Sequence, residues 1–319
     1  MFNYSLKGLN VLAKTNNFNR DTLEKVLRLV DLLKIFNTNE EFKDKYILKG
    51  GTAINLCIFD FPRLSTDIDM NFNLECTKDE MIDIREIHRK LIKVHVELDG
   101  YEISNQSRYS YTLDSYILKY TNTMGSPDNI KLELNYSNRV QIFEPVNYYI
   151  SSNIIEEMSI LALNKTELYG SKIAALIGRT AARDLYDVYE MVSNNVIDKN
   201  EESDLRKCSI FYLMTSNDFE TIAELVEVYK VNIENMTFHN IRRNLIPMLH
   251  VGTNIELDEV KKIVNKYIDS LFSLSTLELQ FVNEFIKREY HPEYLFETNI
   301  AERIKTHPMA LWKMMIKNY

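Results

Sequence analysis

Residues that make tight turns are rare in this sequence, and this restricts the folds that the chain can adopt. Only 8 glycines and 6 prolines occur among 319 residues. Barrels and sandwiches of short strands need many such residues, and so do flexible linkers. The sequence therefore favours a protein in which helices dominate, and its length suits two domains of ordinary size.

The charge balance excludes a globally basic protein that coats nucleic acid, although a local basic groove is compatible with it. Lys and Arg number 38 and Asp and Glu number 46, so the formal net charge is −8. The three widely spaced cysteines are typical of buried thiols in a reducing cytosol. No apolar run approaches a membrane span or follows a basic start, so we expect a cytoplasmic protein without membrane contact.

Residues 1–155 combine the patterns of helices and of short strands. Capping residues followed by apolar side chains at steps of three and four predict helices over 21–36 and 78–98. The second of these has its apolar residues at Met81, Ile84, Ile87, Leu91, Val94 and Leu98. Alternating apolar residues predict strands at 46–48, 66–74, 109–113, 116–121 and 130–136. We expect an α+β domain with a small mixed sheet over 1–155.

The strand pattern fades beyond residue 153. Helical spacing predicts helices at 164–178, 182–192, 217–230, 257–273, 276–288 and 308–317. An all-helical domain is therefore expected over 156–319.

Two of the eight glycines are adjacent, at Gly50-Gly51, where the predicted strand 46–48 runs into a short apolar helix at 52–59. A backbone without Cβ atoms lets N–H groups point at a phosphate there, and the helix N-terminus adds a favourable field. An isolated glycine pair at such a junction is more often a tight turn without a ligand.

Asp67 and Asp69 lie on the predicted strand 66–74, the first of them sixteen residues after Gly51. Residues i and i+2 of a strand project from the same face, so the two carboxylates converge. Adjacent like charges are costly unless a cation lies between them, and Mg²⁺ accepts carboxylate oxygens while leaving positions open for phosphates. A solvated strand face is the simpler alternative, and sugar-nucleotide transferases also contain such acidic pairs.

Glu133 is an acid flanked by apolar residues on the predicted strand 130–136. If that strand lies beside the one that carries Asp67 and Asp69, Glu133 completes a three-carboxylate site for divalent ions. Asp114 and Asp128 are the other candidates for the third acid, and Glu133 as an ordinary exposed residue is the alternative.

These motifs resemble the nucleotidyltransferase superfamily related to DNA polymerase β. More narrowly, Leu48-Lys49-Gly50-Gly51-Thr52-Ala53 and Arg63-Leu64-Ser65-Thr66-Asp67-Ile68-Asp69-Met70 resemble the AbiEii/AbiGii toxins of type IV toxin–antitoxin systems. That family also has a lysine followed by an RDxxD-type motif, which Lys172 and Arg183-Asp184-Leu185-Tyr186-Asp187 match. The resemblance covers about residues 45–192. The spacing from glycine to aspartate is longer than in many relatives, and the third acid is Glu instead of the commoner Asp.

The resemblance implies a role for each matching residue. Asp67, Asp69 and Glu133 would hold Mg²⁺ or Mn²⁺ and act in catalysis together with Lys172. An NTP would be bound by Gly50, Gly51, Thr52, Ser65, Lys172, Arg179, Arg183, Asp184 and Asp187. The three cations of this set lie within a dozen residues, on one face of a continuous helix or on either side of a break near Gly178. Pairing of these cations with Asp184 and Asp187 on a solvated helix is the alternative.

The resemblance further implies an RNA acceptor, with the 3′ end of tRNA as the expected site, and a separately encoded antitoxin that need not form a stable complex. The helical domain would contribute its Lys, Arg and Asp residues to the active cleft. Transfer to a protein hydroxyl and a non-catalytic nucleotide-binding module are the alternatives. In the helical domain, Arg242, Arg243, Arg303, Lys305, Lys313 and Lys317 are candidates for an RNA groove, although solvated helix faces explain each of them singly.

Overall fold

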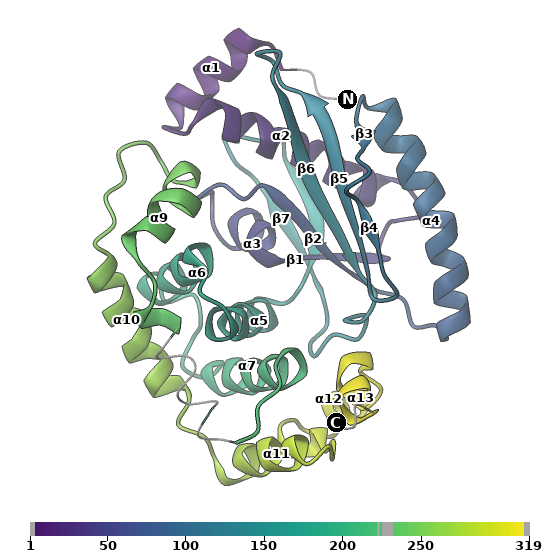
Figure 1. Ribbon diagram of the computed structural model, residues 1–319, viewed down its shortest axis with the longest axis vertical. Helices are drawn as coiled ribbons and strands as arrows, with labels where there is room; N and C mark the ends of the chain where they lie inside the picture. Colours follow the sequence, from purple (N-terminus) through teal and green to yellow (C-terminus); the bar gives the residue numbers. More distant parts are fainter. Residues whose placement is uncertain (1–3, 222–223, 225–231, 316–319) are drawn as a thin grey trace. The chain divides into compact units, whose positions relative to one another are not determined.

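The computed structural model describes residues 4–221, 224 and 232–315, and the chain divides into two compact units (Figure 1). The first unit comprises Met1–Arg139, Pro145–Ala162 and Pro247–Thr253. The second comprises Val140–Glu144, Leu163–Ile246 and Asn254–Tyr319. The expected boundary after residue 155 thus falls within the first unit, because two strands between residues 146 and 162 complete its sheet.

The first unit is built on one mixed sheet, which confirms the α+β class. Its strands are β1 (Tyr46–Lys49), β2 (Asp67–Phe72), β3 (Glu102–Ile103), β4 (Arg108–Tyr109), β5 (Leu113–Thr121), β6 (Pro127–Asn135), β7 (Val146–Ile150) and β8 (Met158–Ala162). They lie in the order β3-β5-β6-β2-β1-β8-β7, with β4 paired to β5. The pairs β2–β6 and β1–β8 are parallel and the others are antiparallel. The strands β7 and β8 were not predicted.

Helices α1 (Leu6–Thr15), α2 (Arg20–Thr38) and α4 (Lys78–Leu98) accompany the sheet. The short helix α3 (Gly50–Ala53) follows β1 directly and continues as a π-helix over Ile54–Ile58. The side chain of Asn19 caps α2, and Thr77 and Glu80 form a capping box at the start of α4. Capping residues satisfy N–H groups that have no partner in the first turn of a helix.

The buried side of α4 differs from the predicted one. Its buried residues are Met81, Arg85, His88, Ile92 and Val96. The ring of His88 bonds through Nδ1 to the Tyr46 hydroxyl at 2.8 Å, and Arg85 donates to the Asp114 carboxylate. With these polar residues on the buried face of α4, Ile87, Val94 and Leu98 are 52%, 53% and 69% exposed. Apolar spacing alone therefore identified the helix but not the face that it buries.

The described residues of the second unit contain helices and no strand. The helices are α5 (Lys165–Gly178), α6 (Ala182–Ser193), α7 (Glu202–Ser216), α9 (Phe238–Asn244), α10 (Leu257–Leu271), α11 (Thr276–Ile286), α12 (Thr298–Ile304) and α13 (Pro308–Met315). Most of the helix predicted at 217–230, and the end of the one at 308–317, lie outside the described residues. Within the described part of the chain, no helix has the length and hydrophobicity that crossing a bilayer requires.

A buried carboxylate ties the segment Val140–Glu144 to the helices of the second unit. Glu167 on α5 accepts hydrogen bonds from the backbone N–H groups of Ile142 and Phe143 and from the Tyr212 hydroxyl. Complete burial raises the pKa of Glu167, although these three donors oppose the shift. A fully bonded buried carboxyl of this kind joins elements that are far apart in the sequence.

Candidate functional site

One face of the central sheet carries a row of polar residues across four strands. Lys49 of β1 is paired with Asp69 of β2, Asp69 with Glu133 of β6, and Glu133 with Ser115 of β5. Residues paired directly across strands share a face, so this row is continuous. Because β6 lies beside β2, Glu133 is next to the two aspartates, which was the condition set by the sequence.

The neighbouring pair along the same face is Asp67 and Lys131. The ammonium of Lys131 lies 2.8 Å from Oε1 of Glu133. Burial disfavours the charged form of Glu133, but Lys131, Ser115 and Asp69 outweigh it, and the pKa of Glu133 is lowered. Lys131 is therefore a cation that neutralises part of the negative charge of the acidic row in this conformation.

The other two candidates for the third acid are engaged elsewhere. Asp114 is paired with Leu134 on the opposite face of the sheet, where it is fully buried and binds Arg85 and Arg89. Asp128 binds Lys25 at 3.3 Å and accepts a hydrogen bond from the Tyr120 hydroxyl at 2.9 Å. Glu133 is thus the acid of these three that lies beside Asp69.

The Gly50-Gly51 turn packs directly against side chains of the acidic site. Gly50 has φ +69°, a conformation that side chains other than glycine rarely adopt. A Cβ atom there would lie 2.7 Å from Oδ2 of Asp69. A Cβ on Gly51 would lie 2.6 Å from Nη2 of Arg63 and 3.1 Å from Oγ of Ser65. Both glycines are therefore required by close approach, and the first also by its backbone conformation.

A network of buried polar groups fixes this turn to β2. The Thr52 hydroxyl donates to the Asp67 carbonyl at 2.5 Å and lies within hydrogen-bond distance of Ser65 Oγ, at 3.0 Å. Asn55 donates to the Gly51 carbonyl at 2.7 Å, and the buried guanidinium of Arg63 donates to the Leu64 carbonyl at 2.9 Å. Sequence reasoning gave no role to Asn55 or Arg63. An arginine placed immediately before the acidic strand was the available indication.

The second predicted cluster lies within the helical unit. Lys172 of α5 has its ammonium 2.8 Å from Oδ1 of Asp184 and 3.0 Å from Oδ2 of Asp187, both on α6. Arg179 donates from Nε to the other oxygen of Asp184 at 2.8 Å. Helix α5 ends at Gly178, so the predicted break is present and Arg179 lies in the connection. Arg183 follows on the first turn of α6 and is half-buried.

Burial separates the roles that these cations can take. The side chain of Lys172 is 8% exposed and that of Arg179 is 66% exposed. Burial opposes ionisation of Asp184, but Lys172 and Arg179 outweigh it and lower the pKa of Asp184 to about 2. Asp184 and Asp187 therefore hold Lys172 in place, whereas Arg179 presents its charge to solvent.

The donor chemistry of the acidic row fits a divalent cation. Carboxylate oxygens are the ligands that Mg²⁺ and Mn²⁺ prefer, and Asp67, Asp69 and Glu133 supply them from two adjacent strands. No group of three or more His, Cys, Asp or Glu side chains in the described residues is already arranged to hold a metal. The contact of Glu133 with Lys131 is thus one that a cation bound by all three acids would have to replace.

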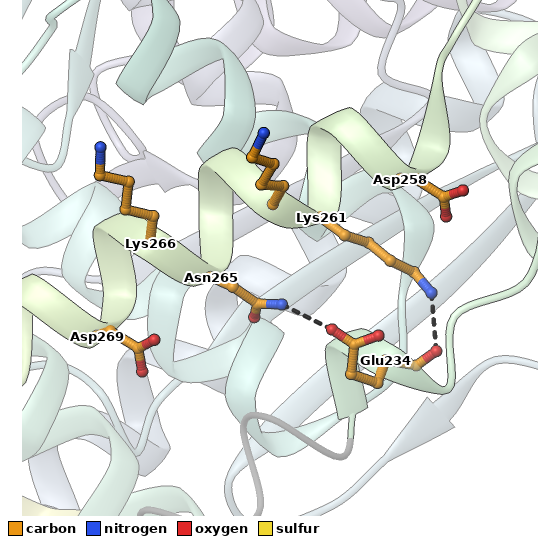
Figure 2. Close-up of a pocket in the computed structure, with 7 residues that line it drawn as sticks. Glu234, Asp258, Lys261, Asn265, Lys266 and Asp269 are labelled. Atoms are coloured by element: carbon orange, nitrogen blue, oxygen red, sulfur yellow. Dashed lines mark hydrogen bonds between the residues drawn. The ribbon is translucent and has the colours of Figure 1, made fainter.

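A separate open pocket of about 540 Å³ lies along α10 in the helical unit (Figure 2). Lys261 donates to the Glu234 carbonyl at 2.8 Å, and Asn265 donates to its carboxylate at 2.9 Å. The full lining is Glu234, Asp258, Lys261, Lys262, Asn265, Lys266 and Asp269. Its three acids balance its three lysines, so the pocket supplies no net field for an anion, and none of the predicted site residues line it.

Comparisons with known proteins identify the family and the fold of the chain. A family model described as nucleotidyl transferase AbiEii toxin, type IV toxin–antitoxin system, matches residues 31–270. Among solved structures, the chain is similar to MenT4, a nucleotidyltransferase toxin from Mycobacterium tuberculosis H37Rv. That match has a TM-score of 0.59 and 14% identity, and it covers 95% of this chain and 98% of the other. No curated protein matches the chain.

At so low an identity, the likeness to MenT4 shows the fold alone. The family model, in contrast, covers most of the chain, and it defines the protein as a nucleotidyltransferase. The chain belongs to the AbiEii nucleotidyltransferase toxin family of type IV toxin–antitoxin systems. The family resemblance drawn from the sequence is thereby confirmed.

Proposed function

We propose that the protein transfers a nucleoside monophosphate from an NTP to a hydroxyl of RNA, with the 3′ end of tRNA as the acceptor. The acceptor oxygen forms a bond to the α-phosphorus, the bond from that phosphorus to the bridging oxygen breaks, and pyrophosphate leaves. The proton of the acceptor hydroxyl passes to a general base, for which Glu133 is the candidate. Blocking the tRNA end would stop aminoacylation and growth, which accounts for a toxin.

The observation that carries this proposal is the cross-strand pairing of Asp69 with Glu133, on the sheet face that also holds Asp67. The Gly50 turn packs against the Asp69 carboxylate. We assign these three acids to a bound Mg²⁺ or Mn²⁺, which when present would neutralise phosphate charge and activate the acceptor oxygen. The chain itself positions the acids. The contact with Gly50 restricts Asp69, and Thr52 and Ser65 fix the turn against β2.

The phosphates of the NTP are assigned to the Gly50-Gly51 turn. Backbone N–H groups at Gly50, Gly51 and Thr52, together with the Ser65 hydroxyl, would bind them at the start of α3. Within the helical unit, Arg179, Arg183 and Lys172, the last held by Asp184 and Asp187, form a cationic group whose chemistry suits a triphosphate. The family implies a cognate antitoxin, which we propose is separately encoded, and a cytoplasmic setting would suit the proposed RNA and NTP substrates.

Incubation of the purified protein with total cellular RNA, Mg²⁺ and each of the four NTPs, labelled at the α-phosphorus, tests the proposal. Wild type should label a band of tRNA size with one NTP or more, and Asp69→Asn should not. Asp83→Asn, which removes an exposed acid from α4, is the matched control and should behave as wild type.

Two outcomes would contradict the proposal. A labelled protein band in place of RNA would indicate nucleotidylation of a protein hydroxyl. Retained NTP binding without any labelled product would indicate a non-catalytic nucleotide-binding module.

A further inference from the structure

Lys131 is placed in the middle of the acidic site by the strand register. It is directly paired with Asp67 and is two residues from Glu133 on the same face of β6. Its ammonium makes a 2.8 Å ion pair with Glu133, and 41% of its side chain is exposed. The chain thus places a cation of its own against Glu133 and next to Asp67 in the acidic row.

This cation and a divalent ion compete for the same oxygens. The carboxylate of Glu133 is only 23% exposed, so its contact with Lys131 is stronger than a pair in bulk water. A divalent ion that takes an oxygen of Glu133 brings a second positive centre toward the ammonium, and like charges at such a distance repel. The ammonium therefore has to leave as the ion enters, and its partly exposed stem permits that movement.

We propose that Lys131 is a positioning residue that holds Glu133 while the site is empty and couples binding of the divalent ion to binding of NTP. This inference rests on the proposed function, because it takes Asp67, Asp69 and Glu133 as the ion's ligands. The ion alone must displace an ammonium that then loses its ion pair with Glu133. When the ion arrives with a triphosphate, the displaced ammonium gains phosphate oxygens in place of Glu133.

The coupling can be measured without turnover by titrating the full chain with Mn²⁺ and following free Mn²⁺ by electron paramagnetic resonance. Each titration is done with and without a non-hydrolysable NTP analogue. In wild type, Mn²⁺ alone should bind weakly, and the analogue should tighten binding about tenfold or more. In Lys131→Met, Mn²⁺ alone should bind about tenfold more tightly than in wild type, and the analogue should add little.

Three further variants test whether the effect depends on the charge at Lys131 or on the loss of any positive charge. Lys119→Met removes an exposed lysine of β5 that lies on the same face of the sheet as Lys131, and it should bind Mn²⁺ as wild type does. Lys131→Arg keeps a cation at the position and should also show wild-type coupling. Lys131→Gln is the second neutral variant and should repeat the result of Lys131→Met if the latter does not fold.

The outcomes of these titrations distinguish a failure of the role inferred for Lys131 from a failure of the proposed function on which that role rests. Tight Mn²⁺ binding that is lost in Asp69→Asn but is the same in wild type, Lys131→Met and Lys131→Gln would overturn the role of Lys131 and leave the proposed function intact. Absence of Mn²⁺ binding by wild type, even with the analogue, would overturn both. A rise in affinity that Lys119→Met shares would assign the effect to net charge and would also overturn the inference.

Discussion

At the scale of single residues, the acidic site depends on a glycine at position 50, where a side chain would be strained and would meet Asp69. Gly50 combines a positive φ with a carboxylate oxygen where its Cβ would be, whereas Gly125 has φ +80° and open space around it. The two positions share the backbone conformation and differ in close approach. They therefore allow the cost of strain to be separated from the displacement of Asp69.

Gly125→Ala should lower the free energy of unfolding by about 1–2 kcal/mol, the cost of a left-handed conformation, and leave transferase activity unchanged. Gly50→Ala should add to that cost a shift of the Asp69 carboxylate, and a misplacement of about 1 Å lowers activity about a hundredfold. Urea unfolding and initial rates of label transfer measure the two effects. Equal activity in the two variants would show that the position of Asp69 is not critical.

The buried ion pairs of Lys172 predict a second effect, on stability. Removing one partner of a buried pair leaves an uncompensated charge, so Lys172→Met should lower the free energy of unfolding by about 3–5 kcal/mol. Lys207→Met is the control, because Lys207 pairs with Asp204 at 3.5 Å on the surface of α7 and such pairs contribute about 0–1 kcal/mol. Urea unfolding at neutral pH compares them, and equal losses would contradict the assignment.

The same cluster predicts how stability changes with pH. The pKa of Asp184 falls from 3.8 to about 2 on folding, so its ion pairs stabilise the protein above pH 4. This contribution, about 2 kcal/mol, is lost as the pH falls from about 4 toward 2. Lys172→Met should flatten the dependence over that window, because the main partner of Asp184 is gone. Unfolding followed by circular dichroism between pH 5 and 3 tests the slope, and an unchanged slope would exclude Asp184 as its source.

The predicted strand that carries Asp67 and Asp69 is present, whereas the residue patterns did not predict the contacts around the two acids. A period of two places Asp67 and Asp69 on one face whatever the neighbouring strands are, so this part of the site needed only local information. The contacts of Lys131, Arg63 and Asn55 depend on register and on close approach across the turn. Sequence spacing carries neither, and for that reason these residues had no predicted role.

At the scale of elements, helix α4 separates what periodicity determines from what packing determines. Ile92 is 3% exposed and Val94 is 53% exposed, although the predicted apolar face included Val94 and not Ile92. Ile92→Ala should lower the free energy of unfolding by about 2–5 kcal/mol through loss of buried methyl groups. Val94→Ala should change it by less than about 0.5 kcal/mol. Thermal or urea unfolding distinguishes them, and the reverse order would restore the predicted face.

Strands β7 and β8 are elements of the sheet that the periodic patterns of the sequence did not predict. They are five residues each, and the segment 151–157 separates them. Their stability comes from pairing with each other and, for β8, from parallel pairing with β1. The pairing of β8 with β1 joins residues that are far apart in the sequence, so local propensity could not indicate it. Local patterns also missed the helices α1, α7, α9 and α12.

At the scale of the whole molecule, a net charge of −8 has to be reconciled with the RNA acceptor that we propose, which is itself an anion. Contact must then be confined to exposed cations that acids do not already neutralise. Among the candidates for an RNA groove, Arg303 pairs with Glu144, Lys305 with Glu302 and Lys313 with Asp218. Arg242 and Arg243 are exposed side by side in the last turn of α9, and they are therefore the cations of this set best suited to bind phosphate.

Transfer to RNA should consequently weaken as salt rises, because each phosphate contact releases counterions when it forms. Between about 50 and 200 mM KCl we expect kcat/KM for the RNA acceptor to fall about tenfold, as a few contacts to single-stranded RNA would give. Replacing both Arg242 and Arg243 by Gln should lower the rate at low salt and make its logarithmic salt dependence shallower. Replacing Lys305 by Gln should do neither, since Glu302 already neutralises it. A rate independent of salt would argue against an RNA acceptor and in favour of a protein one, because the electrostatic term that dominates RNA binding would then be missing.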